Sequence, residues 1–556
     1  MRFARNLLIF ALWPVLILFA RQAEWSLTPI LPSLCALSLV FVFRSALLGL
    51  TGGALAGAFL LAPVAWMAPL FLINDLLLPA LQSRWNLCVL MFTLIMGGFV
   101  GLLNGGGGIS ALVHKLSAGA KHGSRRMEWI TYGLGFGCFF DGLANSMLVG
   151  STMRPVYDRT GSSRNRLAYI VDSTSSPIAC VALLSTWIAY QLSMIKEGLS
   201  AANMDVNPYA MFLAALPGNY YCWFTIALVA IVIHRRWNLA SKAATTPAKH
   251  CPPADESTDY PTTISEDSKQ VMTSRQSTHA AGLHTVWIPL LFLIVMLPAS
   301  LWWSGSRALQ EKIGQMEVRW VDTFAAADTA LMLVVVGLST CLVATLVYPR
   351  NAPLPYGKAF LRGMERMLAP TLILIAAWAL SGSLKQLDAG VWIGHLLSGA
   401  VPAWFLPALV FLAGASISFL TGTSWGTMGI VVPLVIPLAV SMGDSVVGSM
   451  GRSEISSYDL SISVLAAAFS GAVFGDHCSP ISDTTIVSSL ASGVEPFEHV
   501  RTQMPYALIA AGLALFPGFV LAGWTGQLWP GLLAGLVTLL AIWKLLGRNY
   551  SGEHPQ

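Results

Sequence analysis

Four short polar segments interrupt long apolar stretches of this chain, at residues 141–146, 172–177, 421–427 and 476–485. Each combines glycine or proline, which break helices, with side chains that carry oxygen or nitrogen. The candidate site residues are Asp141, Asn145, Asp172, Thr174, Ser175, Thr421, Thr423, Ser424, Asp476, His477, Ser479, Ser482, Asp483 and Thr484. Carboxylate, hydroxyl and amide oxygens are the ligands that small hard cations prefer, so the segments predict a cation or proton site.

The four aspartates Asp141, Asp172, Asp476 and Asp483 are the strongest candidates. An aspartate at the centre of a membrane helix costs roughly 2.5 to 3.5 kcal/mol on the insertion scale, which marks it as functional by default. Asp476 and Asp483 lie seven residues apart and would share a face of a continuous helix, but Pro480 lies between them. The spacing therefore predicts that the two carboxylates lie near each other, but it does not predict their relative orientation. For each Ser and Thr, a hydrogen bond back to a helix carbonyl is an equally good explanation.

Other kinds of site find little support in the sequence. His477 and Cys478 form one adjacent pair without partners at the spacing of Zn or Cu ligands. The glycines at 105–108 lack the Lys-Ser/Thr of a phosphate-binding loop, so we expect a flexible helix end there. No nucleophile, base and orienting partner occur in evident order. We expect neither an enzyme nor a bound cofactor.

The composition indicates what positions these segments. Hydrophobic residues make up 55% of the 556 residues and charged residues only 11%, whereas soluble domains carry about 25% charged residues. The mean hydropathy is +0.65. We predict an all-α polytopic membrane protein embedded in a lipid bilayer. The net charge of +5 reflects Lys and Arg in loops and predicts no nucleic-acid partner.

Apolar runs long enough to cross a bilayer recur along the chain. They predict twelve crossings at 7–20, 26–43, 45–73, 85–103, 167–194, 208–233, 284–303, 326–348, 367–384, 459–491, 504–524 and 528–546. Lys and Arg favour the cytoplasmic side. Segment 129–153 has basic clusters at both ends, which predicts a re-entrant hairpin from the cytoplasm. Segment 404–442 is then predicted to be a hairpin that enters from outside, and both termini are predicted to be cytoplasmic. Arg21 is the one clear exception to the rule that basic residues lie on the cytoplasmic side.

The halves on either side of a polar linker share an order of motifs, which predicts two repeats. Phe139–Gly142 aligns with Phe419–Gly422, and the Asp172 segment aligns with the Asp476 segment. Because the first repeat begins outside and the second inside, the repeats should be inverted, as in secondary transporters. The predicted parts are an N-terminal helix (1–25), repeat 1 (26–233), a cytoplasmic linker (234–283), repeat 2 (284–524), and a C-terminal helix and tail (525–556).

The run from Phe474 to Thr485 closely resembles the signature of the NhaC family of bacterial sodium/proton antiporters, and segments 172–177 and 421–427 are also similar to that family. The resemblance covers roughly residues 85–525. It implies the ion-transporter fold, in which each inverted repeat contributes a re-entrant hairpin and a broken helix. It further implies exchange of cytoplasmic Na⁺ for external H⁺ across the bacterial inner membrane. From the residues themselves we predict Asp476 and Asp483 as Na⁺ ligands at the site where cation and proton compete, with Asp141 and Asp172 supporting it from the opposing repeat.

A Na⁺-coupled or proton-coupled exchanger of small carboxylates, such as malate or lactate, is the alternative. An anionic substrate needs a cationic partner or helix N-termini. No Lys or Arg lies inside the four polar segments, and Arg154 lies just beyond one of them, which favours the antiporter. A third alternative is a membrane sensor that signals through the linker, although the linker has no recognisable output domain. Whether the protein forms a homo-oligomer is left open.

Overall fold

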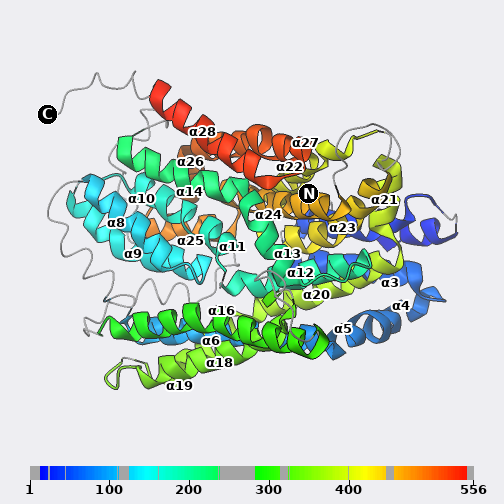
Figure 1. The fold of residues 1–556 in the computed structure, drawn as a ribbon, viewed down its shortest axis with the longest axis horizontal. Coiled ribbons are helices and arrows are strands. Elements are labelled where there is room, and N and C mark those ends of the chain that lie inside the picture. The colour runs from blue at the N-terminus through cyan, green and yellow to red at the C-terminus, as the bar shows by residue number, and fades with distance from the viewer. Residues whose placement is uncertain are drawn as a thin grey trace, which may run out of the picture.

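The computed structural model is a bundle of α-helices (Figure 1). It describes residues 13–14, 16–22, 25–43, 45–108, 111, 124–160, 162–183, 185–235, 237, 282–313, 323–324, 326–352, 354–397, 400–445 and 456–546. No β-strand occurs among these residues. The predicted helical class is therefore confirmed. Most of the predicted linker (234–283) and part of the first predicted span (7–20) lie outside the described residues.

The first half contains two bent helix pairs, one at 164–201 and the other at 208–235. Its long helices are α2 (Leu31–Phe43), α3 (Ala46–Leu61), α6 (Arg84–Gly105), α8 (Ser124–Gly137), α9 (Gly142–Thr160), α10 (Arg164–Ser173), α12 (Thr186–Ala201), α13 (Pro208–Ala215) and α14 (Tyr220–Arg235). Three shorter ones are α4 (Ala68–Phe71), α5 (Leu78–Gln82) and α11 (Ser176–Val181). Pro63 ends α3, since the preceding residue is driven to extended backbone, so the predicted span 45–73 is divided in two.

The second half repeats the same kinds of element. Its helices are α16 (His284–Ile313), α18 (Thr329–Leu346), α19 (Tyr356–Arg366), α20 (Leu368–Gln386), α21 (Ala389–Leu397), α22 (Leu406–Thr421), α23 (Ser424–Ser445), α24 (Ser457–Cys478), α25 (Asp483–Ser492), α26 (Pro496–Leu513), α27 (Leu521–Thr525) and α28 (Leu528–Leu546). Helices α6, α16, α18 and α19 lie together along the lower edge of Figure 1.

Many helices are long and apolar enough to span a membrane. In the described part of the chain nine such helices occur, or up to eleven if each of two bent pairs counts as one span. Large apolar side chains on outward faces are exposed, for example Val295 on α16 at 61% and Val537 on α28 at 65%. Lipid solvates such a surface, whereas water would not. The chain is a multi-pass membrane protein, and the predicted number of twelve crossings stays a prediction.

Each half contains a helical hairpin followed by an interrupted helix. In the first half, α8 and α9 are joined by a turn at 138–141, and α10 and α11 are separated by two residues, Thr174 and Ser175. In the second half, α22 and α23 are joined at 422–423, and α24 and α25 are separated at 479–482. Helix α9 packs against α25, and α23 packs against α12, so each hairpin contacts the opposite half.

Candidate ion-binding site

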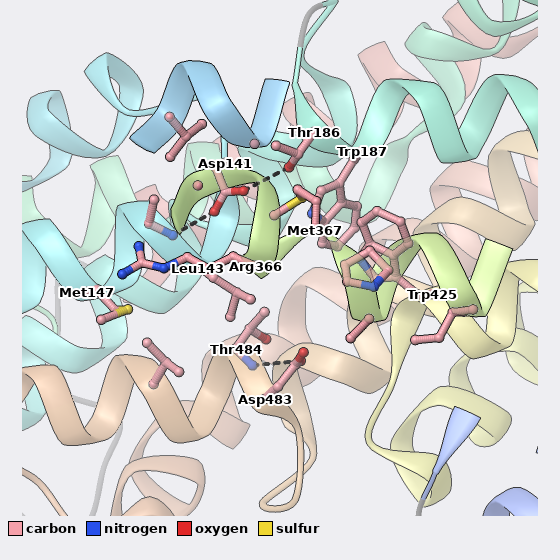
Figure 2. A pocket seen from close by; sticks show the side chains of 18 of the residues that line it. Asp141, Leu143, Met147, Thr186, Trp187, Arg366, Met367, Trp425, Asp483 and Thr484 are labelled. Carbon is pink, nitrogen blue, oxygen red and sulfur yellow. Dashed lines mark hydrogen bonds between the residues drawn. The ribbon is translucent and has the colours of Figure 1, made fainter. Parts of the chain in front are cut away.

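A cavity of about 460 Å³ lies where the hairpins meet the interrupted helices (Figure 2). Its walls come from α6, α9, α12, the junction of α19 and α20, α23 and α25. The polar side chains that line it are Asp141, Thr186, Glu365, Arg366, Thr423, Ser424, Asp483 and Thr484. Trp187 and Trp425 supply aromatic surface on one side and lie with their rings 6.0 Å apart. Two of the four predicted aspartates therefore face one chamber.

Asp141 forms the turn of the first hairpin and caps α9. Its Oδ1 accepts a hydrogen bond from the backbone N–H of Ala144 at 2.7 Å, and its Oδ2 accepts one from Thr186 Oγ1 at 3.0 Å. Figure 2 shows both bonds. A capping carboxylate satisfies an unpaired amide at the start of a helix, which gives Asp141 a structural role as well as a place in the cavity.

Asp483 is the first residue of α25 and its side chain is exposed to the cavity. The backbone N–H of Thr484 donates to its Oδ1 at 2.9 Å. This bond leaves carboxylate lone pairs available to a ligand in the cavity. In a continuous helix, Asp483 would lie roughly 10 Å along the axis from Asp476. The break between α24 and α25 instead lets the chain turn back, so that Asp483 lines the cavity while Ser482 and Thr484 contact Asp476.

Asp476 is buried behind that wall and does not line the cavity. Its Oδ1 accepts a hydrogen bond from Ser482 Oγ at 2.6 Å. Its Oδ2 accepts bonds from Thr484 Oγ1 at 2.9 Å and from Ser176 Oγ of the first half at 3.3 Å. The hydroxyls of Ser482 and Thr484 are 3.0 Å apart. A continuous chain of oxygens thus joins the cavity to Asp476.

Asp172 is also buried and lies outside the cavity. Its Oδ1 accepts a bond from Ser488 Oγ at 3.0 Å, while its Oδ2 contacts Gln503 Nε2 at 2.7 Å and His499 Nε2 at 3.2 Å. Neither His499 nor Gln503 is among the site residues predicted from the sequence. Their spacing of four residues on one helix face was a signal, but the predicted span began only at 504.

Several predicted ligands use their hydroxyls locally. Thr174 Oγ1 donates to Ile170 O at 2.7 Å, and Thr421 Oγ1 donates to Ser418 O at 3.4 Å. Ser175 Oγ accepts from Ser176 N at 2.7 Å, and Ser479 Oγ accepts from Ile481 N at 3.5 Å. These bonds match the alternative explanation, in which such side chains stabilise the broken ends of helices.

The remaining predicted residues hold the hairpin turns in place. Asn145 Nδ2 donates to Gly135 O at 2.9 Å and to Thr174 O at 2.7 Å, which ties the first hairpin to the break in its own half. Thr423 Oγ1 accepts from Gly426 N at 3.2 Å and so caps α23. Thr423 and Ser424 both line the cavity, as do Asp483 and Thr484 of α25.

Arg366 is the main residue of the cavity that the sequence analysis did not place there. It lies at the end of α19, which packs closely against α6 through glycines. A Cβ atom on Gly363 would lie only 2.2 Å from the carbonyl oxygen of Gly97, so a larger residue would push α19 away. Because the contact joins segments far apart in the chain, no local pattern predicts it. No Lys or Arg lies inside the four polar segments, but Arg366 brings a guanidinium into the cavity from a helix outside them.

The architecture defines a class of protein: a polytopic helical carrier with paired hairpins and interrupted helices around a polar chamber. The family model described as "Na+/H+ antiporter family" matches residues 178–524, more than half of the chain. The chain belongs to this family, which confirms the resemblance inferred from segment 474–485. It is a family of transporters, and the match begins within α11 and contains the second interrupted helix, α24 and α25, in full.

The similar proteins include two named antiporters. An uncharacterized protein of Haemophilus influenzae is 30% identical over 531 residues, covering 94% of this chain and 95% of that protein. The Malate-2H(+)/Na(+)-lactate antiporter of Bacillus subtilis is 31% identical over 30% of this chain and 33% of its own length. The Na(+)/H(+) antiporter NhaC of Alkalihalophilus pseudofirmus is 27% identical over 33% of this chain and 37% of its own length.

A solved structure shows the same fold. The YdaH transporter of Alcanivorax borkumensis superposes with a TM-score of 0.52 at 16% sequence identity, covering 87% of this chain and 90% of that one. At this identity the similarity concerns the fold alone.

Proposed function

We propose that this protein is a secondary active antiporter that exchanges Na⁺ for H⁺ across the bacterial inner membrane. The observation that carries the proposal is the series of oxygen groups from Asp483 at the cavity wall, through Thr484 and Ser482, to the buried Asp476. A small cation prefers such ligands. Membership of the Na⁺/H⁺ antiporter family supports the choice of ions.

Cation and proton would compete for the carboxylate of Asp483. Na⁺ in the cavity binds the ionised carboxylate and the Thr484 hydroxyl, with Thr423 and Ser424 facing it from the second hairpin. A hydroxyl group can donate one hydrogen bond and still offer its oxygen lone pairs to a cation. Ser482 and Thr484 can therefore bind the ion while they continue to donate hydrogen bonds to Asp476. Protonation of Asp483 removes the negative charge that binds Na⁺. The site therefore carries either Na⁺ or H⁺ across the membrane, but not both at once.

The inverted repeats would supply alternating access. Asn145 joins the first hairpin to the break at Thr174, and Gly422 of the second hairpin lies against Ile481 in the break of its own half. Each hairpin also packs on a helix of the opposite half. Exchange of conformation between two such units exposes one site to either side in turn. Both termini would be cytoplasmic.

A charge-neutral variant tests the site. In proteoliposomes that hold a pH-sensitive dye, Asp483→Asn should lower Na⁺-driven proton flux at least tenfold, because amide oxygen carries no negative charge. Asp459→Asn is the matched control, since Asp459 is an exposed aspartate in the first turn of α24 and its carboxylate contacts Ser456. Its flux should equal that of the unmodified protein.

The dependence of the apparent Na⁺ affinity on pH tests whether protons and Na⁺ compete. Protons occupy the carboxylates at low pH, so the apparent affinity for Na⁺ should rise as pH rises and fall as pH falls. Full proton flux in correctly folded Asp483→Asn, or a Na⁺ affinity that does not change with pH, would contradict the proposal.

Arg366 favours a second candidate function, the coupled exchange of small carboxylates. The cavity volume of about 460 Å³ greatly exceeds one cation and falls in the range of roughly 300 to 1,000 Å³ that small organic ligands occupy. Arg366 offers a planar fork for a carboxylate, and Trp187 offers apolar surface. The Bacillus subtilis relative is named for malate and lactate. If vesicles free of organic acids show no Na⁺ flux until malate or lactate is supplied, this candidate replaces the first.

A further inference from the structure

We propose that the cavity also binds an organic ammonium ion that carries an apolar group, and that this ion competes with Na⁺ for the carboxylate of Asp483. The inference rests on the proposed antiport, because both cations would use the same carboxylate. A single Na⁺ cannot fill a chamber of about 460 Å³, a volume typical of sites for small organic ligands. Many of the side chains that line the chamber also offer no oxygen ligand to a metal ion.

The charged side chains of the cavity favour a cationic ligand. Among the described residues that line it, Asp141, Glu365 and Asp483 are acidic and Arg366 is basic. In their charged forms these three carboxylates and one guanidinium give a formal charge of −2. Charges act more strongly in a chamber with low-dielectric walls than in water. A cation is therefore favoured over an anion of equal size.

The negative charge is concentrated on the two aspartates. Glu365 and Arg366 are consecutive residues at the end of α19, so their opposite charges largely offset each other. Asp141 and Asp483 lie on other walls, at the first hairpin turn and at the start of α25 (Figure 2). Both oxygens of Asp141 accept hydrogen bonds. For Asp483, the described residues supply one donor, the backbone N–H of Thr484 to Oδ1. Asp483 thus has the greater capacity to bind a ligand.

A primary ammonium group matches this carboxylate. It has three N–H donors, and a hydrogen bond between an ammonium and a carboxylate is strengthened by both charges. The hydroxyls of Thr423, Ser424 and Thr484 also line the cavity and can accept from the remaining donors. These are the oxygens that we propose for Na⁺. The two cations therefore exclude each other at Asp483.

Two tryptophans form an aromatic wall that suits the positive charge of such a ligand. Trp187, near the start of α12, and Trp425, near the start of α23, lie side by side with their ring planes at 69° (Figure 2). Tyr190 supports Trp425, since its hydroxyl donates to the Trp425 carbonyl oxygen at 2.6 Å and the ring centroids are 4.5 Å apart. Indole faces attract cations, so this wall favours an ammonium ion over a neutral ligand of the same shape.

Apolar side chains complete the cavity and provide space for the organic group. Leu143 and Met147 come from α9, Met367 lies between α19 and α20, and Ile373 comes from α20. Burial of an apolar group against these side chains is favourable, whereas a metal ion gains nothing from them. The flexible thioethers of the two methionines adapt to the shape of the group. A phenyl or alkyl group attached to the ammonium therefore fits this part of the chamber.

Direct binding tests the inference without any transport step. The full-length protein in nanodiscs is titrated at pH 7, in Na⁺-free potassium phosphate, with 2-phenylethylammonium, with neutral 2-phenylethanol and with the anion 3-phenylpropanoate. Titration of empty nanodiscs corrects for partition into lipid. Isothermal titration calorimetry should show that the ammonium ion binds at least tenfold more tightly than either other probe. Added Na⁺ at constant ionic strength should raise the apparent dissociation constant of the ammonium ion.

Two variants locate the ligand in the cavity. Asp483→Asn should weaken binding of the ammonium ion at least tenfold but change binding of 2-phenylethanol less than threefold, since the alcohol carries no charge. Trp187→Leu should weaken binding of the ammonium ion at least threefold. The matched controls are Asp459→Asn and Trp529→Leu, because Asp459 is exposed, Trp529 is 61% exposed on α28, and neither lines the cavity. Both controls should bind the ammonium ion as the unmodified protein does.

Three results would overturn the inference: binding of the alcohol or the anion as tight as that of the ammonium ion, ammonium binding that Na⁺ does not weaken, or full ammonium binding in folded Asp483→Asn. Tighter binding of the anion would in addition support the exchange of carboxylates. If the ammonium ion binds as expected but Na⁺ drives no proton flux in the unmodified protein, the antiport proposal fails while the binding site stands, which is a separate outcome.

Discussion

The four aspartates occupy two environments that differ in access. Asp141 and Asp483 line the cavity, whereas Asp172 and Asp476 are buried behind it and accept hydrogen bonds from hydroxyl, amide and imidazole groups. A transported ion can reach the first pair directly. The second pair can respond to it only through the hydrogen bonds between them. The four aspartates therefore fall into two pairs with different surroundings, a difference that their shared residue type does not reveal.

At the residue scale, Arg366→Gln distinguishes the two candidate functions. For a cation antiporter, removal of a positive charge from the cavity should increase the apparent Na⁺ affinity by a small factor and leave maximal proton flux within about threefold, since a screened charge is worth roughly 1 kcal/mol. For a carboxylate exchanger, malate or lactate uptake should fall at least tenfold. Arg362→Gln, one turn earlier on α19 and outside the cavity, is the control. Loss of all Na⁺ flux in Arg366→Gln would contradict the cation antiporter.

At the scale of elements, the hairpin turns connect to the interrupted helices. Gly422 ends α22 with φ +68°, and a Cβ atom there would lie 2.9 Å from the carbonyl oxygen of Ile481. Gly142 of the first hairpin lies beside Ser175 in the corresponding break, where a Cβ atom would meet its backbone at 3.7 Å. The second turn is therefore the more tightly packed of the two.

Gly422→Ala should destabilise the protein by about 1 to 2 kcal/mol from the left-handed backbone alone. The clash with Ile481 would also displace the second hairpin, so transport should fall more than stability does. Thermal unfolding in detergent and Na⁺-driven proton flux measure the two effects. Gly133→Ala is the control, because a Cβ atom there meets nothing within 4 Å and alanine favours helix. Equal behaviour of the two variants would contradict the packing role of Gly422.

At the scale of the whole molecule, the predicted inversion of the two halves awaits a direct measurement. In a cysteine-free background, Ser151→Cys at the first hairpin should react with a membrane-impermeant thiol reagent from the cytoplasmic side. Ser441→Cys at the end of the second hairpin should react from outside. The reason is the distribution of basic clusters around segment 129–153, which favours the cytoplasm at both of its ends. Reaction of both cysteines from one side would exclude the inverted arrangement.

The sequence by itself determined the helical membrane class, the two hairpins, the two interrupted helices and the family. These features depend on composition and local order: apolar runs must form helices in lipid, and glycine or proline next to polar residues must interrupt them. The residues of segment 476–485 are therefore sufficient to predict the break between α24 and α25. Signals of this kind are contained within about twenty consecutive residues.

The tertiary structure alone decided which polar groups share a chamber. Arg366 entered the cavity because glycines let α19 approach α6, and His499 reached Asp172 because α26 packs against α10 and α24. Both contacts join residues separated by hundreds of positions, and both depend on how side chains fill the space between helices. Local sequence patterns do not predict contacts between residues so far apart in the chain. Residue type therefore identifies Asp172 and Asp476 as candidates, but only the packing of the helices shows that they lie outside the cavity that Asp483 lines.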